Sequence, residues 1–305
     1  MGLSQLLKIG GLLFFKRFCN GFLSILKTSP MLRAGLGILL LIVLMAVFEP
    51  LINGYLLKGH KSTEFGLFER LLPPSYEHPL GTDHFGRDLF ALQLTGLLYS
   101  LVIGLIAGGV ATIIAVVIAV TAGYTGGKLD AILNSATNAI LVIPSLPILI
   151  AITAYVRMDL ILMSLTLAVF SWPGAARATR AQILSLKEMS YVELAKVSAL
   201  NKVEIMFTEI LPNLIPYIIV GFANAIVGAI LAETGLRMIG LGPSEIPSIG
   251  FLLNRAMDSG ALAQGYYQMV LAPAFLLLLT FISLNLINVG LEEVFNPRLK
   301  KITGG

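Results

Sequence analysis

The chain has 305 residues, of which 56% are hydrophobic and only 12% are charged, and its mean hydropathy is +0.87. Soluble domains carry about 25% charged residues, and a chain this apolar could not cover itself with polar surface in water. Its 21 Lys and Arg residues are spread between long apolar runs, which argues against nucleic-acid binding, and its single cysteine, Cys19, excludes a disulfide scaffold. We therefore expect an integral membrane protein.

The first segment, residues 1–30, is apolar but is interrupted by Lys8, Lys16 and Arg17. No small-residue cleavage site follows a clean apolar core, so the segment does not read as a signal peptide. Its leucines and phenylalanines predict a basic amphipathic helix that lies on the membrane surface and ends before Pro30.

Six apolar stretches approach or exceed the roughly 20 residues that a membrane-spanning helix needs. They are residues 31–52, 97–124, 131–156, 160–176, 210–232 and 269–291. The sequence therefore predicts an all-α integral membrane protein with six transmembrane helices. In this organisation the first helix and an outer loop occupy residues 31–96, a five-helix core occupies 97–291 with a cytoplasmic loop at 177–209, and a tail follows at 292–305.

The distribution of basic residues predicts the orientation, because cytoplasmic loops carry an excess of Lys and Arg. Placing the N-terminus inside assigns fourteen Lys and Arg residues to the cytoplasmic segments and seven to the outer segments. Both termini are therefore expected in the cytoplasm.

Small residues recur every four positions in two of the predicted spans, which lets neighbouring helices approach closely. The second span carries Ala107, Ala111, Ala115, Ala119 and Gly123, and the fifth carries Gly221, Ala225 and Ala229. Packing within this subunit is the preferred interpretation of both stripes, and packing against a second membrane subunit is the alternative.

Prolines and asparagines mark irregular or polar places in the spans. Kinks are expected at Pro144 and Pro147 in the third span and at Pro212 and Pro216 at the start of the fifth. The asparagines of the third and sixth spans favour interhelical hydrogen bonds, with the lining of a water-filled pathway as the alternative. These residues are Asn134, Asn138, Asn285 and Asn288.

No Asp, Glu, Lys, Arg or His lies near the centre of any predicted span. Proton-coupled transporters usually keep such residues there, so their absence argues against proton coupling. The nearest approach to an ATP-binding loop, Gly123 to Leu129, has the wrong spacing and lacks the Ser or Thr that binds Mg²⁺. If this chain moves a solute uphill, another chain supplies the energy.

The cytoplasmic loop contains two predicted capping boxes, Ser190 with Glu193 and Asn201 with Glu204. They indicate two short helices joined near Leu200, a stiff element suited to transmitting movement from a docked protein into the fifth span.

This loop resembles a known family. Glu193-Leu194-Ala195, the break at Ala199 and Ile210-Leu-Pro-Asn213 are similar to the "EAA…G…I-LP" loop of ABC importer permeases, with Leu194 in place of Ala and Ala199 in place of Gly. The resemblance implies that a short helix seats in a groove of a cytoplasmic ATPase. The coupling residues would be Tyr191, Glu193, Leu194, Ala195, Ala199, Leu200 and Asn201.

An outer loop carries a second motif of the same family. Residues 78–88 are similar to the "HPLGTD..GRD" signature of the C-type permeases of dipeptide, oligopeptide and nickel importers, which leaves His84 and Phe85 unspecified. Its central residues are Gly81, Thr82, Asp83, Gly86, Arg87 and Asp88. We expect its charged residues to tether the loop, in preference to contacting substrate. Three outer histidines, His60, His78 and His84, are weak evidence for a nickel site, and no metal site is predicted.

The resemblance implies the type I ABC importer permease fold in the inner, or cytoplasmic, membrane of a prokaryote. It implies a homologous second permease, two ATPases that bind ATP and Mg²⁺, and an extracytoplasmic solute-binding protein, with no catalysis and no cofactor in this chain. Peptides are the expected substrates, with oligosaccharides or nickel as alternatives. A self-contained secondary transporter is the rival from another class, and a non-transporting membrane scaffold is a third reading.

Overall fold

A computed structural model describes residues 29–243 and 245–295. The predicted surface helix up to residue 28, Cys19 and the tail from residue 296 lie outside the described residues. Within the described ranges the chain is helical, and its only extended pairing is an isolated bridge between Thr82 and Asp88.

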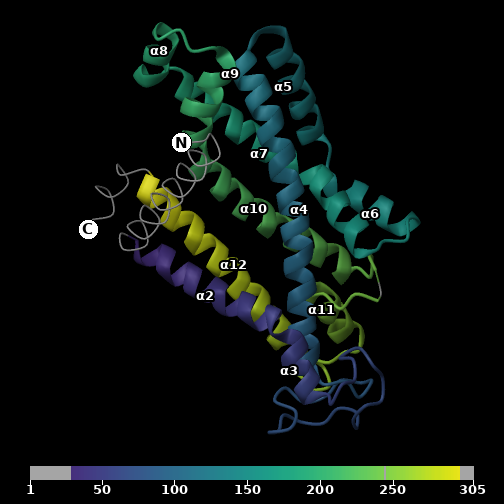
Figure 1. The fold of residues 1–305 in the computed structure, drawn as a ribbon. Helices are drawn as coiled ribbons and strands as arrows, with labels where there is room; N and C mark the ends of the chain where they lie inside the picture. Colours follow the sequence, from purple (N-terminus) through teal and green to yellow (C-terminus); the bar gives the residue numbers. More distant parts are fainter. Residues whose placement is uncertain (1–28, 244, 296–305) are drawn as a thin grey trace, which may run out of the picture.

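The membrane-spanning elements are five long apolar helices and one bent pair of shorter helices (Figure 1). The long helices are α2 (Pro30–Val47), α4 (Leu89–Thr125), α7 (Leu160–Lys187), α10 (Leu211–Met238) and α12 (Gln268–Phe295). The pair is α5 (Gly127–Val142) and α6 (Ser145–Tyr155), which meet at 73°. Counting this pair as one span, the described chain contains the six predicted transmembrane helices, and the predicted all-α fold is confirmed.

Prolines break two of the predicted spans. The third span bends at Pro144, which stands at the N-cap of α6 and lacks the N–H that would continue α5. The first span ends at Val47, and a short helix, α3 (Glu49–Leu56), follows with Pro50 in its first turn.

Helix α4 begins at Leu89, so the predicted start at Leu97 is wrong. Asp88 caps the helix, its Oδ1 accepting a hydrogen bond of 2.8 Å from the Ala91 N–H. The hydropathy pattern misses these first turns because they include polar residues such as Gln93 and Thr95, which are nevertheless buried. Helix α11 (Ile249–Asp258) is likewise too short and polar to be predicted as a span.

Helix α4 lies at the centre of the bundle, with α7 and α10 packed against it (Figure 1). Its predicted stripe of small residues is buried within this subunit, since Ala107, Ala111, Ala115 and Ala119 are at most 1% exposed. The stripe on α10 divides: Ala225 and Ala229 are buried, whereas a Cβ at Gly221 would meet no atom within 4 Å. Packing within the subunit, the preferred interpretation, is therefore confirmed for α4 and for two of the three residues of the α10 stripe.

Two adjacent glycines of α4 provide a matched test of this packing. A Cβ added at Gly108 would lie 2.9 Å from the backbone N of Ile226 on α10, whereas one added at Gly109 would meet nothing within 4 Å. Gly108→Ala forces two backbones apart and should destabilise the protein by about 1–3 kcal/mol. Gly109→Ala should be neutral or slightly stabilising, because alanine is the better helix former. Thermal unfolding in detergent measures both, and equal effects would contradict this account.

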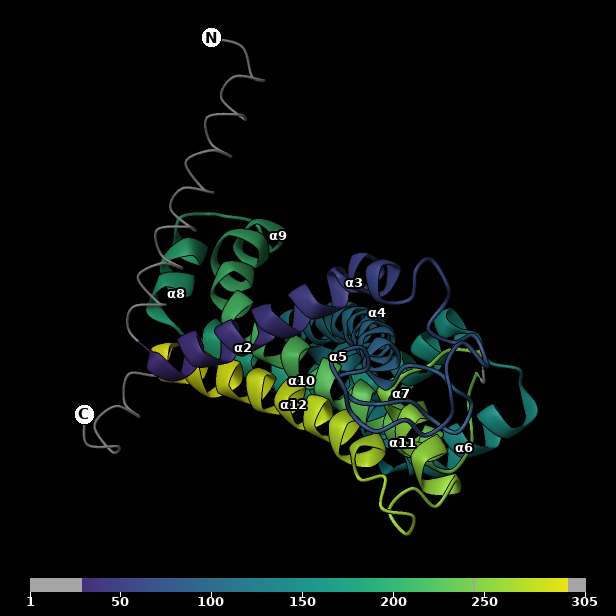
Figure 2. The same cartoon turned by 90° about the horizontal axis from the view of Figure 1, so that it is seen from below.

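The first and last described helices, α2 and α12, run side by side along one flank of the bundle (Figure 2). They approach at Gly35 and Gly290, where a Cβ would lie 2.8 Å from the Ile287 N and 2.6 Å from the Leu32 N respectively. The Ser29 hydroxyl also donates a hydrogen bond of 2.7 Å to Glu293. This contact joins the two ends of the described chain.

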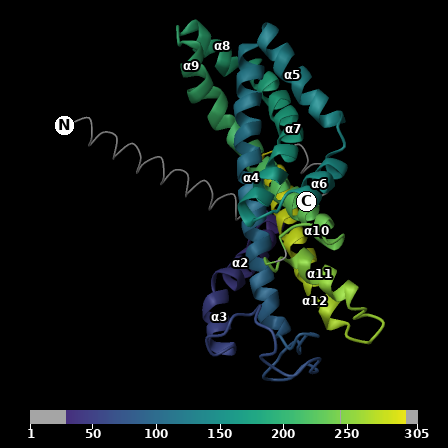
Figure 3. The ribbon, with the colours of Figure 1, turned by 90° about the vertical axis from the view of Figure 1, so that its right-hand side faces the viewer.

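The two motifs singled out in the sequence lie at opposite ends of the bundle (Figure 3). One end carries α8 (Ser190–Val197) and α9 (Lys202–Ile205), and the other carries α3, α11 and the loop before α4. The long α4 connects the two ends.

Candidate functional site

The predicted coupling loop forms two short helices followed by a π-helical turn, η1 (Met206–Ile210), which leads into α10. The second capping box is confirmed: the Asn201 N–H donates to Glu204 Oε2 (2.8 Å) and the Glu204 N–H to Asn201 Oδ1 (2.9 Å). The first capping box is wrong. Met189 is the N-cap of α8, and its carbonyl accepts from the Val192 and Glu193 N–H groups, which leaves Ser190 as the first helical residue.

The joint between α8 and α9 is a tight turn at Ala199. This residue has φ = 61°, and the next N–H, that of Leu200, returns to the carbonyl of Ala195 (3.3 Å). The conformation is left-handed, which a glycine adopts without strain and an alanine adopts at a cost. The structure therefore places a left-handed turn where the family pattern has glycine, although this chain carries alanine.

One face of α8 is buried against the bundle. Val192 and Ala195 pack with Ile183 of α7 and Leu214 of α10, among other residues. Burial, with the nearby Glu209 carboxylate, raises the pKa of the partly buried Tyr191 phenol, so this side chain stays neutral at physiological pH. The coupling loop is thus attached firmly to the helices that it would have to move.

The opposite face of the loop presents apolar side chains to solvent. We name as the coupling patch Leu194, Val197, Val203 and Phe207, which are 68%, 84%, 60% and 57% exposed. Glu193 is also exposed on this helix. An apolar patch outside the membrane-spanning part of a protein is typical of a surface that another protein covers.

One ion pair and two hydrogen bonds fix the start of this loop. Arg180 on α7 forms a bidentate pair with Asp130 on α5, both contacts measuring 2.6 Å. Lys187 donates to the carbonyl oxygens of Gly123 (2.9 Å) and Tyr124 (3.2 Å) at the end of α4. These ties were not predicted, because no local pattern pairs residues fifty or more positions apart.

The signature loop, residues 78–88, is held together by its charged residues, as expected for a tether. Asp83 and Arg87 form a buried pair, with Arg87 Nε 2.7 Å and Nη2 2.6 Å from Asp83 Oδ2. Asp88 does not join this pair; besides capping α4, it contacts His78 Nδ1 at 2.7 Å. Thr82 bridges Glu69 and Leu72 through its hydroxyl.

Two glycines of the signature are required by the backbone. Gly81 and Gly86 have φ of 77° and 72°, and a Cβ at either would collide with a carbonyl oxygen, of Leu72 or Phe68. The three outer histidines do not converge: His60 contacts Glu64, and within the described ranges no three His, Cys, Asp or Glu residues form a potential metal site.

A second buried cluster, missed by the sequence analysis, connects α10 to α11. Glu233 Oε1 accepts hydrogen bonds from Arg237 Nε (3.0 Å) and from the Ser248 hydroxyl (2.5 Å). Arg237 also donates to the carbonyl oxygens of Pro243 and Ile246, and Ser248 caps α11. The signal available in the sequence was the i, i+4 spacing of the acid and the base.

The four candidate pathway asparagines do not behave alike. Asn288 on α12 donates to the side chain of Asn224 on α10 (2.7 Å), as expected for an interhelical bond. Asn134 is half-buried, and Asn138 and Asn285 are exposed on the isolated subunit. Among the described residues, none of these three makes a side-chain hydrogen bond.

Comparisons with known proteins agree with this geometry. Residues 111–301 match the family described as the binding-protein-dependent transport system inner membrane component. The chain is 32% identical to the dipeptide transport system permease protein of Bacillus subtilis, over 90% of this chain and 84% of the relative.

It is also 33% identical to a probable peptide ABC transporter permease protein of Sinorhizobium fredii, over 91% and 92% of the two chains. The oligopeptide transport system permease protein of Bacillus subtilis is 29% identical over 90% and 88%. The sequence matches extend over about nine-tenths of this chain. The chain therefore belongs to the family of inner-membrane components of binding-protein-dependent transport systems, the non-enzymatic permeases of ABC transporters.

Proposed function

We propose that this chain is a permease subunit of an ATP-driven, binding-protein-dependent importer of dipeptides and oligopeptides. The observation that carries the proposal is the exposed coupling patch on a loop that is packed firmly against α4, α7 and α10. Such a loop can receive force from a docked protein and pass it to the helices. The names of the relatives support peptides, in preference to oligosaccharides or nickel, as the substrates.

In the proposed complex, two cytoplasmic ATPases bind ATP and Mg²⁺, and one of them holds Tyr191 to Asn201 in a groove. Nucleotide-driven closure of the ATPases moves α8, and η1 transmits the movement to α10. A π-helical turn at this junction supports the proposal, because such turns are frequent at functional sites. Both termini lie in the cytoplasm, and the subunit resides in the cytoplasmic membrane of a prokaryote.

A homologous second permease completes the path in this proposal. Helices α7, α10 and α12 line a groove of about 350 Å³, whose polar lining residues include Gln182, Asn224 and Glu292. The open side of Gly221 supports an approach of the partner or of solute there. Asn134, Asn138, Asn285 and Asn288 remain candidate pathway residues.

Reconstitution tests the proposal. The chain is co-expressed with the second permease, the ATPases and the solute-binding protein of its transport system, and the complex is placed in liposomes. We expect ATP-dependent uptake of a radiolabelled dipeptide that requires the binding protein. Uptake by this chain alone under an ion gradient would indicate a secondary transporter, and uptake of a saccharide but no peptide would overturn the substrate assignment.

A further inference from the structure

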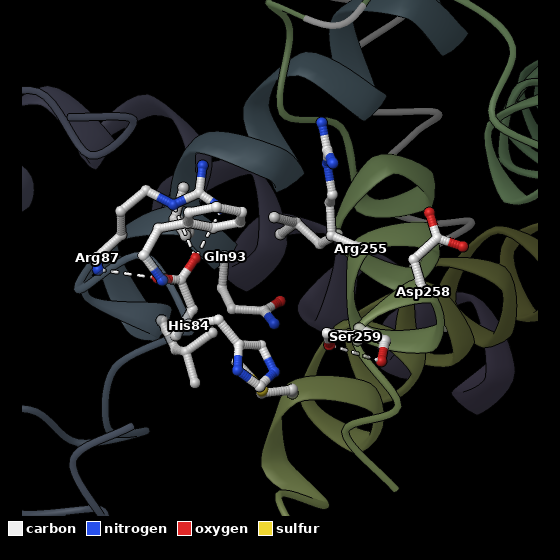
Figure 4. A pocket seen from close by; sticks show the side chains of 13 residues that line it. His84, Arg87, Gln93, Arg255, Asp258 and Ser259 are labelled. Atoms are coloured by element: carbon white, nitrogen blue, oxygen red, sulfur yellow. Dashed lines mark hydrogen bonds and ion pairs between the residues drawn. The ribbon is translucent and has the colours of Figure 1, made fainter. Parts of the chain in front are cut away.

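A pocket of about 240 Å³ lies at the outer end of the bundle, between the signature loop and α11 (Figure 4). One wall comes from the signature loop and the first turns of α4, and the other comes from α11 and the start of α12. The Asp83 carboxylate accepts hydrogen bonds from the Arg87 guanidinium and from the Arg87 backbone N–H. This buried pair stabilises the first wall. Its role is therefore to hold the wall, which leaves ligand contacts to other residues.

Two polar side chains that line this pocket each carry a buried atom without a hydrogen-bond partner. Gln93 is 3% exposed, and its Oε1 is buried with no hydrogen-bond donor among the described residues. His84 Nε2 is in the same state, and the ring lies beside Tyr266 with the ring centroids 6.0 Å apart. Buried polar atoms are nearly always hydrogen-bonded in native proteins, so these two indicate a missing polar occupant.

Two charged residues of the pocket lining come from α11, and both are exposed. Arg255 and Asp258 line the pocket, and within the described ranges neither forms an ion pair. Arg255 instead lies over the ring of Phe251, 5.1 Å from its centroid. Figure 4 shows both on the α11 side, across from Arg87 and Gln93, with the Asp258 carboxylate directed away from Gln93 and His84. The lining therefore includes one cation, one anion and an amide, and Asp258 reaches a ligand only by turning its side chain.

We propose that this pocket binds the main chain of a short peptide on its way into the permease. The main chain of the peptide contacts the Gln93 amide, Arg255 takes the terminal carboxylate, and the Asp258 side chain turns toward the pocket to take the terminal ammonium group. Since these contacts involve only groups that all short peptides share, side chains are not selected here. The assignment of peptide as the ligand rests on the proposed function, whereas the pocket and its orphaned polar atoms do not.

Because the chain has a single cysteine, Cys19, it can be removed and one thiol introduced at the pocket. The labelling rate of that thiol then reports whether the pocket is occupied. In a Cys19→Ser background, Ser259→Cys places a thiol in the pocket wall, and the assembled complex is treated with N-ethylmaleimide before mass spectrometry of this chain. Millimolar Ala-Ala, without ATP, is expected to slow labelling about tenfold. A Tyr76→Cys control, at a fully exposed position of the outer loop, should label at the same rate with or without the peptide.

Adding Gln93→Leu to the Ser259→Cys chain should remove the protection. In transport assays, Gln93→Leu alone should raise the KM for Ala-Ala about tenfold with little change in maximal uptake. Acetylated and amidated Ala-Ala, which lacks both terminal charges, should protect poorly. Equal protection by alanine or maltose, or none by Ala-Ala, would overturn the site.

These experiments distinguish a wrong assignment of the pocket from a wrong proposed function. If the wild-type complex takes up Ala-Ala but Ser259→Cys is not protected, the pocket assignment is wrong and the importer proposal stands. If Ser259→Cys is protected but the complex imports no peptide, the pocket binds peptide and the proposed function is wrong.

Discussion

Replacing Val197 and Val203 with aspartate is expected to reduce ATP-driven uptake by more than about hundredfold. These side chains are 84% and 60% exposed, so the folded permease tolerates charge there. A docked ATPase would bury them, and burying an unpaired carboxylate costs more than about 1.4 kcal/mol each, which is a factor of ten in affinity. The effect of the double variant is therefore on assembly and leaves the fold intact.

Co-purification of the ATPases with the tagged permease measures assembly, and uptake in liposomes measures coupling. Val197→Leu with Val203→Leu is the matched control, because it keeps the patch apolar and should retain both. Val192→Asp serves as a second comparison: this side chain is fully buried, so the variant should damage the permease itself. Wild-type assembly and uptake in the Asp double variant would contradict the proposed coupling role.

Glu193→Ala separates docking by apolar contact from docking by charge. The Glu193 side chain makes no hydrogen bond among the described residues, although it stands on the exposed side of α8. A loss of uptake in this variant would therefore arise from a contact with the ATPase, since no contact within the permease is removed.

The fold was predictable where the information was local. Long apolar runs predicted the spans, and prolines predicted the bend at Pro144. The Asn201–Glu204 box was predictable because both of its hydrogen bonds span three residues. The Ser190 box failed because the carbonyl of Met189 satisfies the same N–H groups, a competition that residue types do not reveal.

The unpredicted features depend on packing between distant segments. The polar first turns of α4 resemble a loop in the sequence, because their burial depends on the packing of α3 and α11 against them. Helix α11 itself is short and has no spanning signal. For the same reason the sequence identified the signature but not the pocket behind it, which requires Gln93 and α11 to face the loop. A polar residue of a motif can be held by contacts within the chain or be free to bind a ligand. Which of the two applies depends on residues that are distant in the sequence.

The buried pair of Glu233 and Arg237 provides the largest expected effect on stability. Both side chains are at most 3% exposed, and Arg237 joins α10 to the segment that leads into α11. Arg237→Met removes the cation and leaves a carboxylate buried without compensation, which should destabilise the protein by about 3–5 kcal/mol. The apparent unfolding temperature of the detergent-solubilised protein should fall accordingly.

A double variant distinguishes the loss of charge balance from the loss of packing. Glu233→Gln with Arg237→Met removes both charges while keeping similar volumes, and replacing a whole buried pair by neutral groups is often nearly neutral. The double variant should therefore recover most of the stability lost in Arg237→Met. If it is as unstable as the single variant, the hydrogen bonds from Arg237 to the carbonyl oxygens of Pro243 and Ile246 hold α11 in place, and the charge of Glu233 contributes little.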